Sequence, residues 1–159
     1  MNLTNTYTIL MPCLNEALTL PKCIEMAKLG ILQSGLKAEI LVADNGSVDG
    51  SQIIASDLGA RVINVPEKGY GSALYYGCLA AKGNFIIMAD SDQSYDFSRL
   101  EMFIEKFNQG NEFIIGNRFL GGIAAKQRVL VTGSKCFHVL FMCNHYGNGR
   151  MAGCIASCT

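Results

Sequence analysis

The stretch FIIMADSDQSYDF, residues 85–97, starts as an apolar run and ends in a cluster of carboxylates. Its first five residues are all apolar, which is typical of a strand that is buried on both faces. Asp90 and Asp92 then follow one residue apart, and Asp96 comes soon after. Carboxylates this close repel one another, so a cation, a proton or water has to compensate their charge. The stretch therefore predicts a buried strand with an acidic cluster at its carboxyl end.

Similar apolar runs alternate with helical patterns along the first 116 residues. The predicted strands span residues 7–12, 38–44, 61–66, 84–90 and 112–116. The predicted helices span residues 18–35, 50–59, 72–83 and 97–110. Gly35 suits the end of the first helix, Ser47 or Asp49 could cap the second, and Ser98 the fourth. Apolar strands separated by single helices predict an α/β fold, with a parallel sheet covered on both faces and right-handed crossovers.

The composition excludes several classes of protein. The chain has 159 residues, of which 50% are apolar and only 16% are charged, so it is not a disordered polyelectrolyte. Thirteen basic and thirteen acidic side chains cancel, which leaves no basic excess for a nucleic-acid partner. We see neither a signal peptide nor an apolar run approaching the ~20 residues of a membrane helix. We therefore expect a cytoplasmic protein whose seven cysteines are reduced.

Three polar segments follow three of the predicted strands. In open α/β sheets, ligands bind beyond the carboxyl ends of the strands. That rule places the segments PCLNE (12–16), DNGSVDG (44–50) and DSDQ (90–93) along one rim, although they are far apart in the sequence. Three polar clusters on one edge of an apolar sheet predict a binding site.

The acidic segments have the chemistry of a metal site and of a nucleotide site. In an extended segment, residues two apart point the same way, so Asp90 and Asp92 can face one ion. Their hard oxygen ligands favour Mg²⁺ or Mn²⁺. The alternative is a solvated loop with three surface acids. Asp44 could accept hydrogen bonds from a base or a ribose, or it could belong to a plain strand-to-helix turn.

The segment PEKGYGSALYYG, residues 66–77, has features of an anion site. Gly69 and Gly71 allow close approach of the backbone to a ligand, Lys68 adds a positive charge, and a helix start follows. The segment matches neither G-x-G-x-x-G nor the P-loop, which disfavours a dehydrogenase or a P-loop kinase. Arg118 follows the fifth strand, and its planar guanidinium suits phosphate oxygens, although it could also be a surface arginine paired with an acid.

The order of these motifs along the chain resembles the family 2 glycosyltransferases with the GT-A fold. Within that family it is similar to the polyprenyl-phosphate sugar transferases, such as the dolichyl-phosphate mannose or glucose synthases. The likeness covers about residues 6–123. It implies a Rossmann-like α/β domain with a mainly parallel sheet flanked by helices. It also implies transfer of a sugar from a nucleotide-sugar donor to a polyprenyl-phosphate acceptor, with a metal assisting departure of the nucleotide. Such an enzyme would be cytoplasmic or peripheral at the cytosolic face of a membrane.

The resemblance assigns roles to individual residues. Asp44 matches the acid that contacts the base, whereas Asn45 stands where many relatives have a second Asp. Asp90 and Asp92 match the metal-binding D-x-D, with Gln93 as an added polar ligand. Asp92 and Arg118 carry the catalytic roles, and Arg118 matches a phosphate-binding arginine. The residues expected to hold the nucleotide are Pro12, Asn15, Glu16, Asp44, Asn45, Lys68, Gly69 and Asp90.

The chain departs from the family pattern after Gly122. We expect a nucleotide-sugar-binding domain over residues 1–122 and an atypical tail with an incomplete acceptor region over residues 123–159. The apolar patch at 139–142 is expected to be exposed on a loosely docked tail. The cysteines and histidines of the tail lack the usual spacing of a zinc site.

Two other readings stay open. One is a truncated, non-catalytic nucleotide-binding remnant of such an enzyme. The other is a nucleotidyltransferase, although the glycine-rich basic loop that it needs after the first strand is missing from PCLNEALTL (12–20). The sequence does not indicate the sugar, the nucleobase or the oligomeric state.

Overall fold

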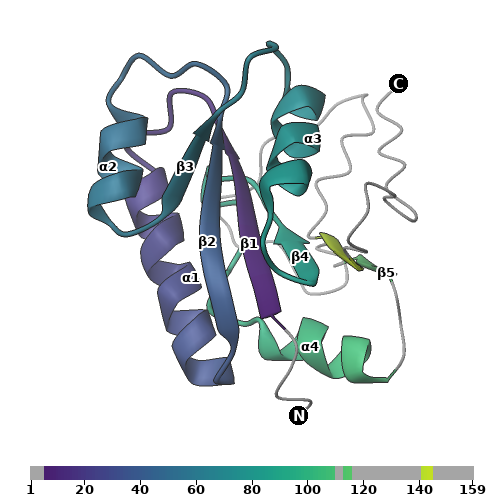
Figure 1. Ribbon diagram of the computed structural model, residues 1–159. Helices are drawn as coiled ribbons and strands as arrows, with labels where there is room; N and C mark the ends of the chain where they lie inside the picture. Colours follow the sequence, from purple (N-terminus) through teal and green to yellow (C-terminus); the bar gives the residue numbers. More distant parts are fainter. Residues whose placement is uncertain (1–5, 110–112, 116–140, 145–159) are drawn as a thin grey trace, which may run out of the picture.

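The computed structural model describes residues 6–109, 113–115 and 141–144, and these residues form one sheet with helices on both faces (Figure 1). The sheet order is β3-β2-β1-β4-β6-β5. The first four strands in the chain pair in parallel, whereas β6 runs antiparallel to both of its neighbours. The strand bounds are β1 Thr6–Cys13, β2 Lys37–Asp44, β3 Arg61–Asn64, β4 Phe85–Met88, β5 Phe113–Ile115 and β6 Phe141–Asn144.

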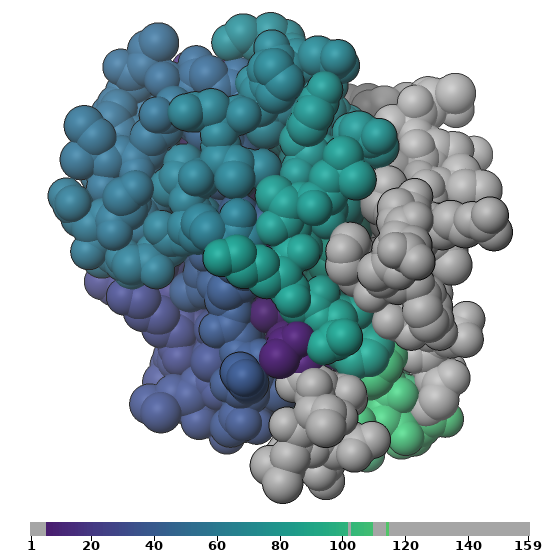
Figure 2. Space-filling model, in the orientation of Figure 1, coloured from purple at the N-terminus to yellow at the C-terminus, as the bar shows by residue number. Residues whose placement is uncertain are grey.

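The helices divide between the two faces of the sheet. Their bounds are α1 Leu20–Ser34, α2 Ser51–Asp57, α3 Tyr70–Ala80 and α4 Glu101–Asn108. On one face, alternate residues of β1 such as Ile9 and Met11 pack against α1, α2 and α4. On the other face, Leu10 packs with neighbouring strands against α3. The continuous apolar pattern of β1 therefore follows from burial on both sides, and in Figure 2 little more than the start of this purple strand reaches the surface.

The acidic stretch is held at both of its ends. Before it, Ala89 N–H donates to the carbonyl of Leu10 on β1. After it, Phe97 is fully buried against α1. Gly30 of α1 permits this contact, because a Cβ there would overlap with the Phe97 carbonyl oxygen. The loop between β4 and α4 therefore has fixed ends and a solvent-facing middle.

The predicted α/β architecture is confirmed, and the differences lie at helix starts. Gly35 ends α1 in the left-handed conformation, as predicted. The N-cap of α2 is Gly50 instead of Ser47 or Asp49, and the N-cap of α4 is Leu100 instead of Ser98. The cause at α4 is local, because Asp96 holds the Ser98 N–H and hydroxyl in a separate turn before the helix.

The tail also differs from the expectation. We assigned no strand to it, yet β6 lies inside the sheet, where Met142 pairs with Ile87 of β4 and Ile114 of β5. The expectation of a loosely docked tail is therefore wrong for the backbone of residues 141–142, which pairs within the sheet, while residues 139–140 and the boundary at 122 lie outside the described part of the chain. Among the described helices, none has the length and apolar character needed to cross a bilayer.

Candidate functional site

A cleft of about 400 Å³ opens at the carboxyl ends of β1, β2 and β4, beside the start of α3. Its lining comes from the segments that the sequence placed on one rim, together with the loop before α3. The lining residues are Pro12, Cys13, Leu14, Glu16, Asn45, Lys68, Gly69, Tyr70, Ala73, Asp90, Ser91 and Asp92. A larger hollow of about 750 Å³ lies at the opposite end of the sheet. In that hollow, Glu39 and Arg61 form an ion pair with each other. Because these two charges already have each other as partners, the cleft is the better candidate for a ligand site.

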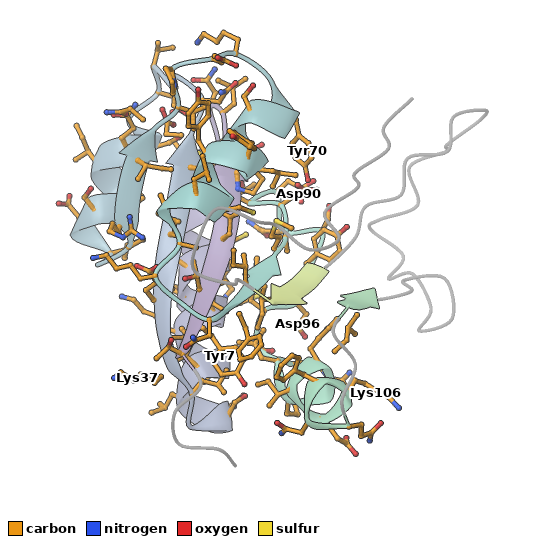
Figure 3. The ribbon with its side chains drawn as sticks, turned by 45° about the vertical axis from the view of Figure 1, so that its right-hand side comes forward. Tyr7, Lys37, Tyr70, Asp90, Asp96 and Lys106 are labelled. Atoms are coloured by element: carbon orange, nitrogen blue, oxygen red, sulfur yellow. The ribbon has the colours of Figure 1, made fainter. Side chains whose placement is uncertain are left out.

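Ser91 fixes the orientation of the two acids that flank it. It is buried, and its hydroxyl donates to the carbonyl of Pro12 at 2.9 Å. Asp90 Oδ1 accepts a hydrogen bond from the Tyr70 hydroxyl at 2.8 Å, which joins β4 to the start of α3 (Figure 3). Asp92 is exposed, and its carboxylate accepts bonds from the Ser94 N–H at 2.8 Å and the Ser94 hydroxyl at 2.7 Å. With Ser91 turned inward, both carboxylates reach the cleft.

The cleft is lined by three acids, Glu16 after β1 and the pair Asp90 and Asp92 after β4, and their spacing matters for a metal. Within the described residues, no group of three or more His, Cys, Asp or Glu side chains could hold an ion. Gln93 follows the pair with a φ of 65°, in the left-handed region. It is not among the residues that line the cleft, and its role as a metal ligand stays a prediction.

The loops after β1 and β2 are joined by reciprocal hydrogen bonds. Asn15 N–H donates to Ser47 Oγ at 2.8 Å, and Val48 N–H donates to Asn15 Oδ1 at 2.9 Å. Ala17 N–H donates to Asp49 Oδ2 at 2.9 Å. Asn15 itself has a φ of 58°. Its side chain therefore stabilises the rim and does not line the cleft.

Asp44 ends β2, directly before the cleft-lining Asn45, and is fully buried. Its Oδ2 accepts bonds from Gly46 N–H at 2.9 Å, Ser47 N–H at 3.0 Å and Gln52 Nε2 at 2.6 Å. Its Oδ1 has no partner among the described residues. Oδ1 can therefore accept a hydrogen bond from one further donor. Such a bond would be favourable, because an unsatisfied buried oxygen costs free energy. The predicted contact of Asp44 with a base stays a prediction, and Asp44 itself is not among the residues that line the cleft.

Asn45 and Lys68 join the end of β2 to the loop before α3. Asn45 Nδ2 donates to the Glu67 carbonyl at 2.7 Å, and Gly69 N–H donates to Asn45 Oδ1 at 2.7 Å. Lys68 Nζ donates to the Asn45 carbonyl at 3.1 Å. The ammonium group lies against Gly46, where a Cβ would overlap with it. Lys68 is thus held at the wall of the cleft as a fixed positive charge.

Two buried thiols, Cys13 and Cys23, lie near the site, and the pKa of each is raised. Burial raises the pKa of Cys13, whose Sγ lies 3.9 Å from Ser47 Oγ. Burial also raises the pKa of Cys23, to about 11. Both groups are therefore neutral thiols at pH 7.

The structure gathers most of the predicted residues and leaves a few apart. Those that line the cleft are Pro12, Glu16, Asn45, Lys68, Gly69, Asp90 and Asp92. Those that do not are Asn15, Asp44 and Gln93. Arg118 lies outside the described residues. Sequence reasoning missed Tyr70 and Ser91, although each is adjacent to a residue that it selected.

Comparisons with known proteins agree with this geometry. The family profile described as "Glycosyl transferase family 2" matches residues 8–159. An uncharacterized glycosyltransferase of Mycobacterium tuberculosis is 36% identical over 114 residues, covering 72% of this chain and 49% of that relative. A protein of Haloferax volcanii named dolichyl-phosphate hexose transferase is 32% identical over 101 residues, covering 64% of this chain and 44% of its own length. This chain spans about half the length of the curated relatives that it matches.

A solved structure shares the fold. Glucosyl-3-phosphoglycerate synthase from Mycobacterium tuberculosis, crystallised in complex with UDP, superimposes with a TM-score of 0.50 at 30% identity. The match covers 56% of this chain and 34% of the synthase.

Proposed function

Because this chain belongs to glycosyl transferase family 2, we propose that it binds a nucleotide-sugar donor in the cleft and transfers the sugar to a phosphate-bearing acceptor. The observation that carries the proposal is the composition of the cleft wall. Lys68 and the loop before α3 line one part of the cleft, and Asp90 and Asp92 line another. A cation beside a helix start suits a diphosphate, whereas paired carboxylates suit a metal that bridges to it.

The donor set fits Mg²⁺ or Mn²⁺. Asp90 and Asp92 offer hard oxygens, and a cation that keeps several waters and binds substrate phosphates needs only one or two protein carboxylates. When bound, the metal would neutralise negative charge on the departing nucleoside diphosphate. Ser91 prepares the site, because its bond to Pro12 holds the segment between the two acids. Lys68 would offset the remaining charge of the diphosphate from the other wall.

The acceptor we propose is a polyprenyl phosphate at a membrane surface. The support is the Haloferax volcanii relative named dolichyl-phosphate hexose transferase. A phosphate oxygen of the acceptor would form a bond to the anomeric carbon while the bond to the nucleoside diphosphate breaks, with inversion. Phosphate is already anionic near neutral pH, so no strong general base is required. Arg118 would bind this phosphate, and the protein would be cytoplasmic, at the cytosolic face of the membrane.

The second candidate function is nucleotide-sugar binding without sugar transfer. If transfer occurs, 3-phosphoglycerate is the alternative acceptor, because it appears in the name of the structurally similar glucosyl-3-phosphoglycerate synthase. Incubation with radiolabelled UDP-glucose or GDP-mannose, and with either dolichyl phosphate or 3-phosphoglycerate, separates the three outcomes by product. Donor binding with no product from either acceptor would leave a nucleotide-binding protein.

Metal-dependent nucleotide binding is the first test of the cleft. We expect UDP or GDP to bind at least about tenfold more tightly with Mn²⁺ than in EDTA, a difference of ~1.4 kcal/mol or more in binding free energy. Asp92→Asn should remove most of this gain, because an amide is a weaker ligand than a carboxylate. Isothermal calorimetry on the 159-residue chain measures both effects.

Asp96→Asn is the matched control. Asp96 accepts bonds from the N–H and hydroxyl of Ser98, just as Asp92 does from Ser94, but Asp96 does not line the cleft. Both variants weaken one local turn, so their unfolding temperatures should be similar. Equal affinity in Mn²⁺ and in EDTA for the wild-type chain would refute the metal role.

A further inference from the structure

We propose that Asn45 is a positioning residue that places Lys68 in the cleft wall and does not itself bind the nucleotide. From the sequence, Asn45 is expected to contact the nucleotide. The hydrogen bonds of the described residues assign its side chain to the protein instead. The consequence for ligand binding rests on the proposed function, whereas the structural part stands without it.

Asn45 is almost fully enclosed, and both ends of its amide are engaged. The residue is 4% exposed. Its Nδ2 donates to the Glu67 carbonyl and its Oδ1 accepts from Gly69 N–H, each at 2.7 Å. Its backbone N–H donates to the Cys13 carbonyl at 2.9 Å. The amide therefore clamps the turn before α3 to the ends of β1 and β2, and little of it is left to face a ligand.

The backbone of Asn45 completes the clamp by binding the cation. Its carbonyl accepts from Lys68 Nζ at 3.1 Å, within the same loop that the side chain holds. Gly46, with a φ of 94°, lets the lysine chain cross the turn. One residue thus fixes the peptide on both sides of Lys68 and also fixes the ammonium group. Without the clamp, the long lysine side chain would have to lose its own conformational freedom when a phosphate binds.

The clamp requires an amide because it needs a donor and an acceptor at once. A carboxylate of the same shape could accept from Gly69 but would face the Glu67 carbonyl with negative charge. It would also attract the Lys68 ammonium away from the cleft. Asn45→Asp should therefore release the turn although it changes hardly any volume.

The protonated form of the same variant should restore the clamp. A neutral carboxyl group has one O–H donor and one carbonyl acceptor, which reproduces the pattern of the amide. Burial, the neighbouring Asp44 carboxylate and the Glu67 carbonyl all favour the neutral form, as does Asp90 across the cleft, while Lys68 opposes it. The balance should raise the pKa of this carboxyl above that of an ordinary aspartate, so lowering the pH from 7.5 to 5 should move the variant towards the clamped form.

Amide hydrogen exchange of Gly69, followed by NMR on the full chain, reports the clamp without any ligand. In Asn45→Asp we expect the Gly69 protection factor to fall about tenfold at pH 7.5 and to recover at pH 5. Calorimetry at both pH values should show that UDP affinity, relative to the wild-type chain, is also lowered at pH 7.5 and recovers at pH 5. In a variant that is only less stable overall, neither the Gly69 protection factor nor the UDP affinity would recover at low pH.

Asn84→Asp is the matched control. Among the described residues, the side chain of Asn84 bonds only through its amide oxygen, which accepts from the Thr6 hydroxyl at 2.6 Å and the Thr6 N–H at 3.4 Å. A carboxylate can make the same bonds, so neither Gly69 exchange nor UDP affinity should change.

Lys68→Met keeps the test decisive if Asn45→Asp fails to fold. It should retain Gly69 protection, because the side-chain clamp is intact, and lose about tenfold in UDP affinity. Unchanged Gly69 protection in Asn45→Asp, protection that stays lost at pH 5, or unchanged UDP affinity in Lys68→Met would each overturn the proposal. If the wild-type chain binds neither UDP nor GDP, the proposed function fails, and Gly69 exchange still decides whether the clamp exists.

Discussion

Glu39 joins three strands at the end of the sheet opposite the cleft. Its carboxylate accepts from Arg61 at 2.9 and 3.0 Å, from Thr8 Oγ1 at 2.9 Å and from Lys82 N–H at 2.7 Å. Burial alone would raise the pKa of Glu39, but the bonds from Arg61, Lys82 and Thr8 outweigh it, and the pKa is lowered from 4.5. The ionised form is therefore the one that stabilises the sheet.

Glu39→Gln should lower the free energy of unfolding by about 1–3 kcal/mol at pH 7, because Arg61 then lacks its charged partner. A lowered folded-state pKa means that the contribution is present above pH 4.5 and is lost as pH falls through the folded value. Urea unfolding should therefore show a larger difference between wild type and variant at pH 7 than at pH 3.

Glu25→Gln is the control for this prediction. Glu25 lies 3.9 Å from Lys22 in an exposed pair, which should contribute about 0–0.5 kcal/mol. An equal loss of stability in both variants would contradict the role of Glu39.

Single residues also show what sequence reasoning could reach at the site. The acids after β4 were predictable, because a parallel sheet places the ends of its strands on one rim. The role of Asn45 was not, because its partners Glu67 and Gly69 lie more than twenty positions further along the chain. A pattern identifies which residue types are present, whereas the hydrogen bonds decide whether they face the ligand or the protein.

Among the elements, α3 shows why helix starts are harder to predict than helix interiors. We placed its start at Ser72, whereas it begins at Tyr70 after Gly69, whose φ is 125°. A glycine in this conformation ends the preceding loop abruptly, so the helix can begin at once. The shift moves Tyr70 into the helix and brings its hydroxyl onto Asp90.

The packing of α3 on β1 depends on Gly77. A Cβ at this position would lie 2.5 Å from Leu10 Cδ1, so Gly77→Ala should destabilise the fold by about 1–3 kcal/mol through overpacking. Gly71 is in the same helix and has nothing within 4 Å of its Cβ position, so Gly71→Ala should stabilise by about 0.5–1 kcal/mol. Thermal unfolding measures the change in Tm for each variant. Equal changes in Tm for Gly77→Ala and Gly71→Ala would contradict the close approach of α3 to the sheet.

For the molecule as a whole, the parallel part of the sheet could be predicted and the antiparallel insertion could not. Continuous apolar runs separated by helices leave few alternatives to a parallel sheet. The strand β6 has only four residues, FMCN, and its partners Phe85–Met88 lie more than fifty residues earlier. Such a short segment has too little pattern to reveal a long-range pairing. The expected division at residue 122 therefore separates two strands that the structure pairs.

A chain that ends at residue 122 tests how the whole sheet is held together. Without β6, strand β4 would become an exposed edge, and β5 would lose the only partner it has among the described residues. β6 makes four backbone pairs with β4 and three with β5, and the shortened chain loses all of them. Since 1 kcal/mol corresponds to ~2–4 °C for a domain of this size, we expect a clear fall in Tm, together with self-association in size-exclusion chromatography. From the sequence alone, we instead expect residues 1 to about 120 to form the ordered nucleotide-binding half. Equal unfolding temperatures and a monomeric short chain would support that prediction and would show that β6 contributes nothing to the sheet.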